Sequence, residues 1–294
     1  MIINSAFAMR PQFTEIWQTF DELRADFREG APATCMMIIG ETGVGKSTVV
    51  GEYARANLPI RNESEHSFDT KTPVLLVSLK GMSQRLSAAQ TILKKLQRLP
   101  TVAGKLSPVT DRIEAQMKRQ DVELLILDEF QHLAETGAEK TKSQTADWIK
   151  GLAKETRVPI VLVGMPSLAD VITSNAQLAS ITPIRRALAE FRYDNERRRN
   201  AFRSFLTELD ALFPFDQQAG LGEDWLAEKM FLASGGNPRL LCTLLRWAAK
   251  TAIEAGSRRI LEKHLEAAYD KFGGLSGLVD ENPFTRSTLL KQAS

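Results

Sequence analysis

The sequence predicts an α/β protein in which a parallel sheet covered by helices is followed by an all-helical part. Four short apolar runs, each typical of a strand buried on both faces, alternate with stretches of helical periodicity. From about Ala187 onward such runs vanish and only helical patterns remain. We therefore expect an α/β core at residues 1–190, a small all-helical lid subdomain at 191–272 and a flexible tail at 273–294.

The expected elements follow one another in regular alternation. Residues 11–29 carry apolar side chains at helical spacing and predict an amphipathic helix. Strands are expected at 35–40, 73–79, 122–127 and 159–164. Helices are expected at 46–56, 87–99, 108–120 and 146–156, with polar loops at 57–72 and 135–143. The helical part divides into 195–212, 223–234, 238–255 and 262–272.

Composition is that of an ordinary globular protein of 294 residues, 43% hydrophobic and 25% charged. The net charge of +2 does not demand a nucleic-acid partner, although basic residues cluster along the chain. No apolar run approaches the roughly 20 residues of a membrane-spanning helix, and we expect neither a signal peptide nor a membrane partner. Cys35 and Cys242 lack metal-site spacing, which favours a reducing cytoplasm.

A phosphate-binding loop is predicted between the first strand and the helix after it. Residues 40–47 read GETGVGKS and match the pattern G-x-x-x-x-G-K-[ST] completely. Glycines allow a tight turn whose N–H groups face phosphate oxygens, and the following helix N-terminus favours negative charge. We expect ATP to contact Gly40, Thr42, Gly43, Val44, Gly45, Lys46, Ser47 and Thr48, with Lys46 reaching the β- and γ-phosphates.

A metal and water site is predicted where the third strand ends in two carboxylates, in the run LLILDE. Asp128 and Ser47 are the expected Mg²⁺ ligands. Glu129 is the expected base that orients and deprotonates the attacking water, which favours hydrolysis over passive binding. His132 could sense the nucleotide near Glu129, but the pattern favours a simply packed or solvated histidine.

Three later segments carry candidates for sensing the γ-phosphate. Arg185 and Arg186 follow the fourth strand, and one of them would reach a neighbouring subunit's phosphate, although a basic helix face fits equally well. Arg239 follows Pro238 at an expected helix start, where it would touch the γ-phosphate from the helical part. Related ATPases carry a polar sensor at the end of the fourth strand, where this chain has glycine and methionine and the nearest hydroxyl is that of Ser167.

The chain resembles AAA+ ATPases in the order of its motifs, which read GETGVGKST, LLILDEFQHL, PIVLVGMPSL, ITPIRRALAEF and SGGNPRLL. Within that class it is most similar to the TniB/TnsC family of transposition regulators, which is related more distantly to MuB and to initiator ATPases. The resemblance covers roughly residues 10–272. The tail element Glu281-Asn282-Pro283-Phe284 also resembles a short stretch near the C-terminus of TniB-type proteins.

The resemblance implies a P-loop AAA+ core with a helical lid and an ATP-dependent oligomer, ring or filament, on double-stranded DNA of any sequence. It implies recruitment of a DDE transposase and often of a target-selection protein. In that frame Arg186 resembles the trans-acting finger and Arg239 the second sensor. The resemblance places DNA contacts near the helices after the second strand. The candidates there, which no sharp motif marks, are Lys80, Lys94, Lys95, Lys118 and Arg119.

Two alternatives stay open at the level of sequence. One is a secretion or pilus-assembly ATPase of the ExeA type, which also has a P-loop and an Asp-Glu-x-Gln element but usually carries a membrane segment. The other is a nucleotide-gated signalling switch with little turnover, against which Glu129 argues. ATP-dependent retention of duplex DNA would separate the transposition regulator from both.

Overall fold

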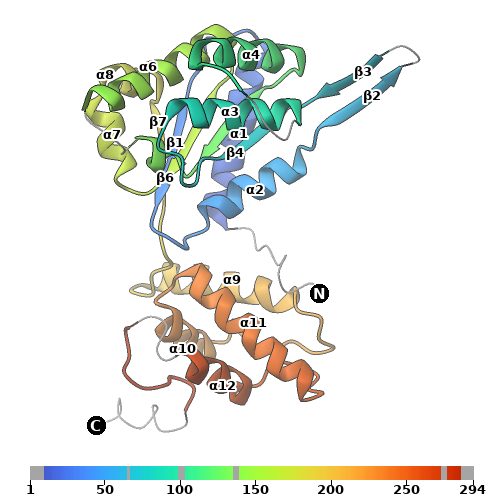
Figure 1. Ribbon diagram of the computed structural model, residues 1–294. Coiled ribbons are helices and arrows are strands. Elements are labelled where there is room, and N and C mark those ends of the chain that lie inside the picture. Colours follow the sequence, from blue (N-terminus) through green and yellow to red (C-terminus); the bar gives the residue numbers. More distant parts are fainter. Residues whose placement is uncertain (1–9, 65–66, 99–102, 135–138, 273–276, 286–294) are drawn as a thin grey trace. The chain divides into compact units, whose positions relative to one another are not determined.

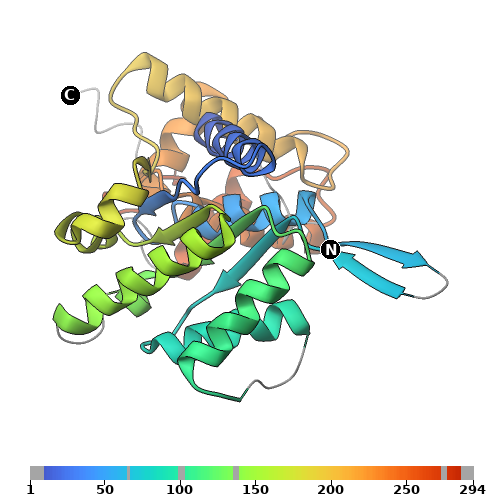
Figure 2. The same cartoon turned by 90° about the horizontal axis from the view of Figure 1, so that it is seen from above.

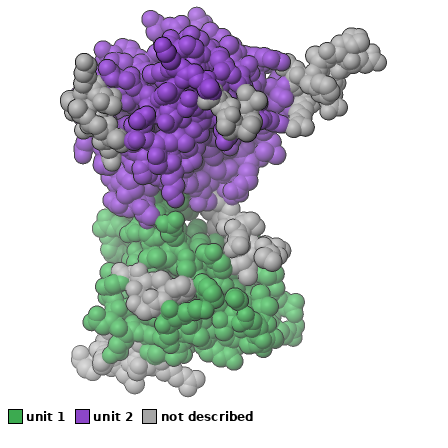
Figure 3. Space-filling view, in the orientation of Figure 1, with its two compact units in different colours: residues 1–11, 43–45, 189–294 green, residues 12–42, 46–188 purple. Residues whose placement is uncertain are grey.

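The computed structural model describes residues 10–64, 67–98, 103–134, 139–272 and 277–285. The chain forms two compact units, coloured separately in Figure 3. The sheet unit comprises residues 12–42 and 46–188. The helical unit comprises residues 1–11, 43–45 and 189–294.

A five-stranded parallel sheet forms the centre of the sheet unit (Figure 1), with strands in the order β4-β5-β6-β1-β7. Their bounds are β1 Met36–Gly40, β4 Val74–Ser78, β5 Leu124–Asp128, β6 Ile160–Gly164 and β7 Ile184–Leu188. Ser78 pairs with Asp128, and Ile39 pairs with Gly164. The carboxyl ends of these strands therefore meet at one edge, where ligands of parallel sheets bind.

Helices cover both faces of this sheet. The helices of the sheet unit are α1 Pro11–Arg28, α2 Lys46–Ala56, α3 Arg85–Gln97, α4 Leu106–Arg119, α5 Gln131–Ala134, α6 Glu139–Thr156, α7 Leu168–Ser174 and α8 Ala176–Ile181. Alternate strand residues such as Met37, Leu125 and Leu162 share a core with residues of α3, α4 and α6. Side chains alternate along a strand, so the buried Met36 and Ile126 face the opposite side, where α1 lies (Figure 2).

Three segments differ from the sequence-based expectation. Residues 60–71 were expected as a loop but form an antiparallel hairpin of β2 (Ile60–Ser64) and β3 (Ser67–Lys71). Strand β7 was not expected, because an exposed edge strand with two arginines lacks the apolar run of its buried neighbours. Helix α6 begins at Glu139, inside the predicted loop 135–143, whose first four residues lie outside the described part. A polar composition led to the prediction of loops at 60–71 and 135–143, but main-chain hydrogen bonds can form a hairpin or a helix from polar residues as well.

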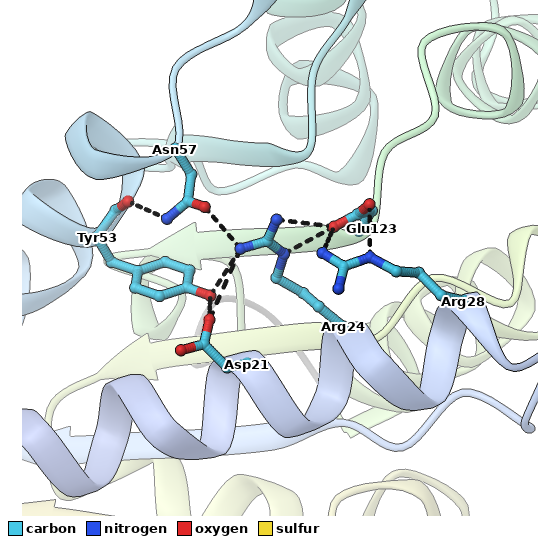
Figure 4. Close-up of polar contacts among 6 residues, drawn as sticks. All are labelled: Asp21, Arg24, Arg28, Tyr53, Asn57 and Glu123. Carbon is cyan, nitrogen blue, oxygen red and sulfur yellow. Dashed lines mark hydrogen bonds and ion pairs between the residues drawn. The ribbon is translucent and has the colours of Figure 1, made fainter.

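A polar network joins α1 to the beginning of β5 and to the end of α2 (Figure 4). Arg24 donates to Glu123 at 2.8 Å, to the Tyr53 hydroxyl at 3.0 Å and to Asn57 at 2.6 Å. Arg28 also donates to Glu123. The network therefore connects α1 to α2 and to β5. The opposite ends of these two elements carry Lys46 and Asp128 of the predicted phosphate and metal site.

The helical unit has its own apolar core. Its helices are α9 Glu196–Ala211, α10 Asp224–Ser234, α11 Pro238–Glu254 and α12 Glu262–Phe272. The segment 277–285 differs from the predicted flexible tail, because Phe284 is buried in this core and Asn282 donates to Glu266 and Asp270. Residues 273–276 and 286–294 lie outside the described part. Among the described helices, none is both long and apolar enough to cross a membrane.

Candidate nucleotide-binding site

The predicted phosphate loop lies between β1 and α2, as the motif requires. Gly43 and Gly45 have φ angles of 90° and 103°, a region that residues with a Cβ atom rarely adopt. Helix α2 begins at Lys46, whose ammonium is buried and donates to the carbonyls of Gly40 at 2.6 Å and Glu41 at 2.9 Å. The loop therefore presents a helix N-terminus and a confined cation in one place, which is the chemistry that binds phosphate.

The predicted metal ligands Ser47 and Asp128 are brought together from α2 and β5. Burial raises the pKa of the Asp128 carboxyl, and hydrogen bonds from the Ser47 hydroxyl and the Glu129 N–H oppose that shift. A hydroxyl and a carboxylate beside the loop fit Mg²⁺, which prefers a few oxygen ligands together with phosphate. The described residues contain no cluster of three or more His, Cys, Asp or Glu side chains that would hold a metal alone.

Glu129 lies directly after β5 in an unusual backbone conformation, with a φ angle of 59°. Its N–H donates to Asp128 Oδ1 at 2.9 Å, which fixes the turn. Its side chain accepts a hydrogen bond of 2.6 Å from Gln131 Nε2. His132 is partly exposed, and its Nε2 lies 3.6 Å from Glu129 Oε2. The carboxylate therefore lies at the carboxyl edge of the sheet, next to the predicted metal ligand.

The end of β6 completes this edge. Thr42 donates to the Met165 sulfur at 3.7 Å. Ser167, the hydroxyl considered as a sensor, is exposed and precedes α7 without capping it. No side chain projects from Gly164 itself, and the space beside it is filled by Gln131 and Leu168.

Arg185 and Arg186 lie on β7, and both are exposed. They pair with Met37 and Ile38, so they precede the carboxyl edge. Arg185 donates to Thr173 of α7 at 3.3 Å, and Arg186 donates to the Arg185 carbonyl. Because side chains alternate along a strand, the two guanidinium groups leave opposite faces of the sheet.

In the helical unit, Arg239 lies in the first turn of α11. Asn237 caps this helix by accepting from the N–H groups of Arg239 and Leu240. The Arg239 N–H also donates to the Gly43 carbonyl at 3.2 Å. A side chain at Gly43 would meet Asn237 Oδ1 at 2.6 Å, which gives this glycine a second constraint besides its φ angle.

Arg10 is a residue of the helical unit that sequence reasoning missed. Its guanidinium donates to the carbonyls of Val44 at 2.8 Å and Ala189 at 2.9 Å, and it stacks over the Phe191 ring. Burial lowers the pKa of Arg10 to about 10. A single arginine before a helix carries no signal in the sequence, because its partners lie far along the chain.

The basic residues considered for DNA contact fall into two places. Gln120, at the end of α4, donates to the Leu96 carbonyl in the last turn of α3, so the two helix ends lie together. Exposed basic residues of these last turns are Lys94, Lys95, Lys118 and Arg119. Lys80 is also exposed but follows β4 and precedes α3, so it lies toward the other end of α3.

Gln131 is the second residue that the sequence did not single out. It reaches Glu129 from α5, a helix of four residues that was not predicted. The signal was present in the run Asp-Glu-Phe-Gln, where the glutamine follows the expected base by two residues.

Comparison with known proteins agrees with the predicted resemblance. A family model described as "TniB: Bacterial TniB protein" matches residues 2–182, more than half of the chain. No curated protein sequence matches.

Several solved structures share the fold at low sequence identity. The Aeropyrum pernix ORC1 protein, solved in complex with DNA, has a TM-score of 0.64 and 16% identity over 90% of this chain and 66% of its own. Cdc6p from Pyrobaculum aerophilum has a TM-score of 0.61 and 12% identity, over 90% and 68%. The Thermotoga maritima RuvB Holliday junction branch migration motor has a TM-score of 0.54 and 15% identity, over 92% and 71%. These similarities confirm the predicted α/β P-loop fold followed by helices.

Proposed function

We propose that this chain, which belongs to the TniB family, is an ATP-dependent regulator of transposition that assembles on double-stranded DNA of any sequence. The chain is an ATPase of the AAA+ type. Its assembly on target DNA would recruit a DDE transposase and, in some cases, a target-selection protein. Both cysteines are free thiols, which supports a reducing cytoplasm as its location.

The grouping of Lys46, Ser47, Asp128 and Glu129 around one loop carries the enzymatic part of this proposal. Lys46 and the N–H groups of the loop would bind the β- and γ-phosphates. Mg²⁺, held by Ser47 and Asp128, would supply neutralising charge to those phosphates when bound. Glu129 would take a proton from a water molecule while the oxygen of that water forms a bond to the γ-phosphorus and the bond between the γ-phosphorus and ADP breaks. ADP and phosphate would then leave.

The basic ends of α3 and α4 support the DNA-binding part. Four exposed cations at adjacent helix ends, Lys94, Lys95, Lys118 and Arg119, offer phosphate contacts without reading bases. Cations in the last turn of a helix also interact favourably with the negative end of the helix dipole. This interaction would by itself explain their presence in a protein that does not bind DNA. We assign these four residues to DNA binding because two helix ends that both carry positively charged side chains lie next to each other. Arg186 would contact ATP bound to the next subunit, and Arg239 would act as a second sensor.

The test is binding of the full chain to random-sequence duplex DNA with ATP and Mg²⁺, with ADP, and without nucleotide, while particle size is followed. We expect DNA-bound assemblies only with ATP. Affinity should fall steeply with salt, and replacing all four cations by alanine should make the negative slope of log K against log salt shallower by up to about 3.6. Lys80→Ala, near the other end of α3, is measured separately and shows whether this fifth candidate also contributes to the slope.

Three outcomes decide among the functions considered. ATP-dependent assembly supports the regulator, and Glu129→Gln should then trap the assembly on DNA by blocking hydrolysis. Hydrolysis without any DNA binding would move the assignment to an ATPase of the secretion or pilus-assembly type. ATP binding with little turnover would favour a nucleotide-gated switch and would contradict the role of Glu129.

A further inference from the structure

Gln131 is a buried polar residue, and within the described residues its side-chain amide has a hydrogen-bond partner for its nitrogen but not for its oxygen. Its side-chain nitrogen donates to Glu129 Oε2 at 2.6 Å. Its side-chain oxygen is buried and has no hydrogen-bond partner among the residues that the structure describes, and the whole residue is only 6% exposed. A buried amide oxygen without a partner is uncommon in folded proteins, so its presence next to a reactive carboxylate requires an explanation.

Gly164, the last residue of β6, explains how this amide is accommodated. A Cβ atom on Gly164 would lie 2.7 Å from Gln131 Oε1 and 2.9 Å from Leu168 Cδ2, closer than such atoms pack. Gly164 does not have the positive φ angle that would itself require glycine. The glycine is therefore needed for space, and the Gln131 amide lies where a side chain from the end of β6 would begin.

We propose that Gln131 is the positioning residue of this ATPase. Presented from α5 into the space beside Gly164, its amide donates to the carboxylate that is the expected base. The inference rests on the role of Glu129 as base, which is part of the proposed function. It adds that Gln131 holds the base in the position from which it acts best.

The contacts of Glu129 indicate how this would work. The hydrogen bond from Gln131 falls on Oε2, and His132 Nε2 approaches the same oxygen at 3.6 Å. Within the described part of the chain, no hydrogen bond reaches Oε1 of Glu129. The Glu129 backbone is fixed by its N–H bond to Asp128. Gln131 therefore holds one carboxylate oxygen and leaves the other to accept the proton of water.

The first test compares Gln131→Met with the wild-type full chain. Methionine has a similar length and fills the buried space, but it cannot donate to Glu129. We measure single-turnover hydrolysis with protein in excess over ATP, and ATP affinity by fluorescence of a labelled analogue. The hydrolysis rate should fall about tenfold to a hundredfold, the effect of misplacing a reacting group. The ATP dissociation constant should change less than about threefold, because the Gln131 amide donates to Glu129 rather than to a residue of the phosphate loop.

The second test asks whether positions 131 and 164 compete for one space. Gly164→Ala should slow hydrolysis as much as Gln131→Ala does, because the methyl group displaces the amide. In the Gln131→Ala background, Gly164→Ala should add less than about a twofold loss of hydrolysis rate, since no amide is left to displace and the remaining close contact, with Leu168 Cδ2, does not involve Glu129. Thermal unfolding of each variant shows whether the fold is kept.

The outcomes separate this inference from the assignment on which it rests. A wild-type rate for Gln131→Met, or losses of rate and ATP affinity of equal size, would overturn the positioning role. Multiplicative losses in the Gln131→Ala/Gly164→Ala double variant would overturn the shared space. Glu129→Gln is measured alongside, and a wild-type rate there would show instead that the base itself is wrongly assigned.

Discussion

Arg24 in α1 and Glu123, the residue before β5, form an ion pair of 2.8 Å although they are 99 positions apart in the chain. The Arg24 side chain is 9% exposed and that of Glu123 is 17% exposed. The same guanidinium contacts Tyr53 near the end of α2. The N-terminal helix is thus bonded to the two elements whose opposite ends carry Lys46 and Asp128.

Arg24→Met should destabilise the sheet unit by about 2–4 kcal/mol, because it leaves the Glu123 charge partly buried with Arg28 as its remaining ion-pair partner among the described residues. Arg28→Met is the matched control. Arg28 binds the same carboxylate but its side chain is 53% exposed, so its loss should cost at most about 1 kcal/mol. Urea unfolding followed by circular dichroism measures both, and equal effects would contradict the importance of burial.

The contribution of Glu123 should depend on pH in a defined direction. Burial raises the pKa of the Glu123 carboxyl, but hydrogen bonds from Arg28 and Arg24 outweigh it and hold that pKa below its ordinary value. A lowered pKa in the folded state gives stability that is present above the unfolded pKa of about 4.3 and is lost as the pH falls through the folded value. The stability difference between wild type and Glu123→Gln should therefore be constant above about pH 5.5 and shrink below about pH 4. A difference that grows on acidification would refute this.

Gly43→Ala should weaken ATP binding about tenfold or more. Alanine at a φ of 90° is strained by roughly 1–3 kcal/mol, which favours loop conformations whose N–H groups no longer face the phosphates. Gly51→Ala, in the interior of α2, is the control. Its added Cβ atom would meet nothing closer than Arg55 Nη2 at 3.8 Å, so it should stabilise the protein by about 0.5–1 kcal/mol and leave ATP affinity unchanged. Titration with a fluorescent ATP analogue and thermal unfolding give the two readings.

Mixing experiments test which arginine of β7 acts in trans. Lys46→Ala should not bind ATP, and Arg186→Ala should bind ATP but lack the finger. Each should be nearly inactive alone, whereas a mixture should regain part of the DNA-dependent ATPase activity, because an intact Arg186 can serve the site of the other variant. The same pairing with Arg185→Ala discriminates the two, since alternation places their side chains on opposite faces. No recovery in either mixture would argue against a trans role.

Phe284→Ala should destabilise the helical unit by about 3 kcal/mol, because it empties a buried aromatic site next to Tyr269. Leu278→Ala provides the comparison. That side chain is 56% exposed, and its truncation should change stability by less than about 0.5 kcal/mol. In a Trp17→Phe/Trp148→Phe background, fluorescence from Trp225 and Trp247 reports this unit alone. An unaltered transition for Phe284→Ala would show that the segment 277–285 is not needed for its stability.

The local features of this protein were determined by the sequence itself. The four buried strands could be predicted because strands covered on both faces consist almost entirely of apolar residues. The phosphate loop could be predicted because its turn depends on glycines within eight consecutive positions, Gly40 to Ser47. Asp128 and Glu129 followed from their place at the end of β5, which brings them to the loop in any parallel sheet of this order.

The tertiary structure alone decided the relationships between distant residues. Strand β7 is defined by its pairing with β1, not by its own composition, and Phe284 became a core residue because a core elsewhere had space for it. Gln131 reads as an ordinary polar residue until Gly164, 33 positions later, leaves room for its amide beside Glu129. Hydrophobic periodicity within a segment indicates which face of that helix or strand is buried. A contact between two distant segments depends on how they pack together, which the local sequence of either segment does not determine.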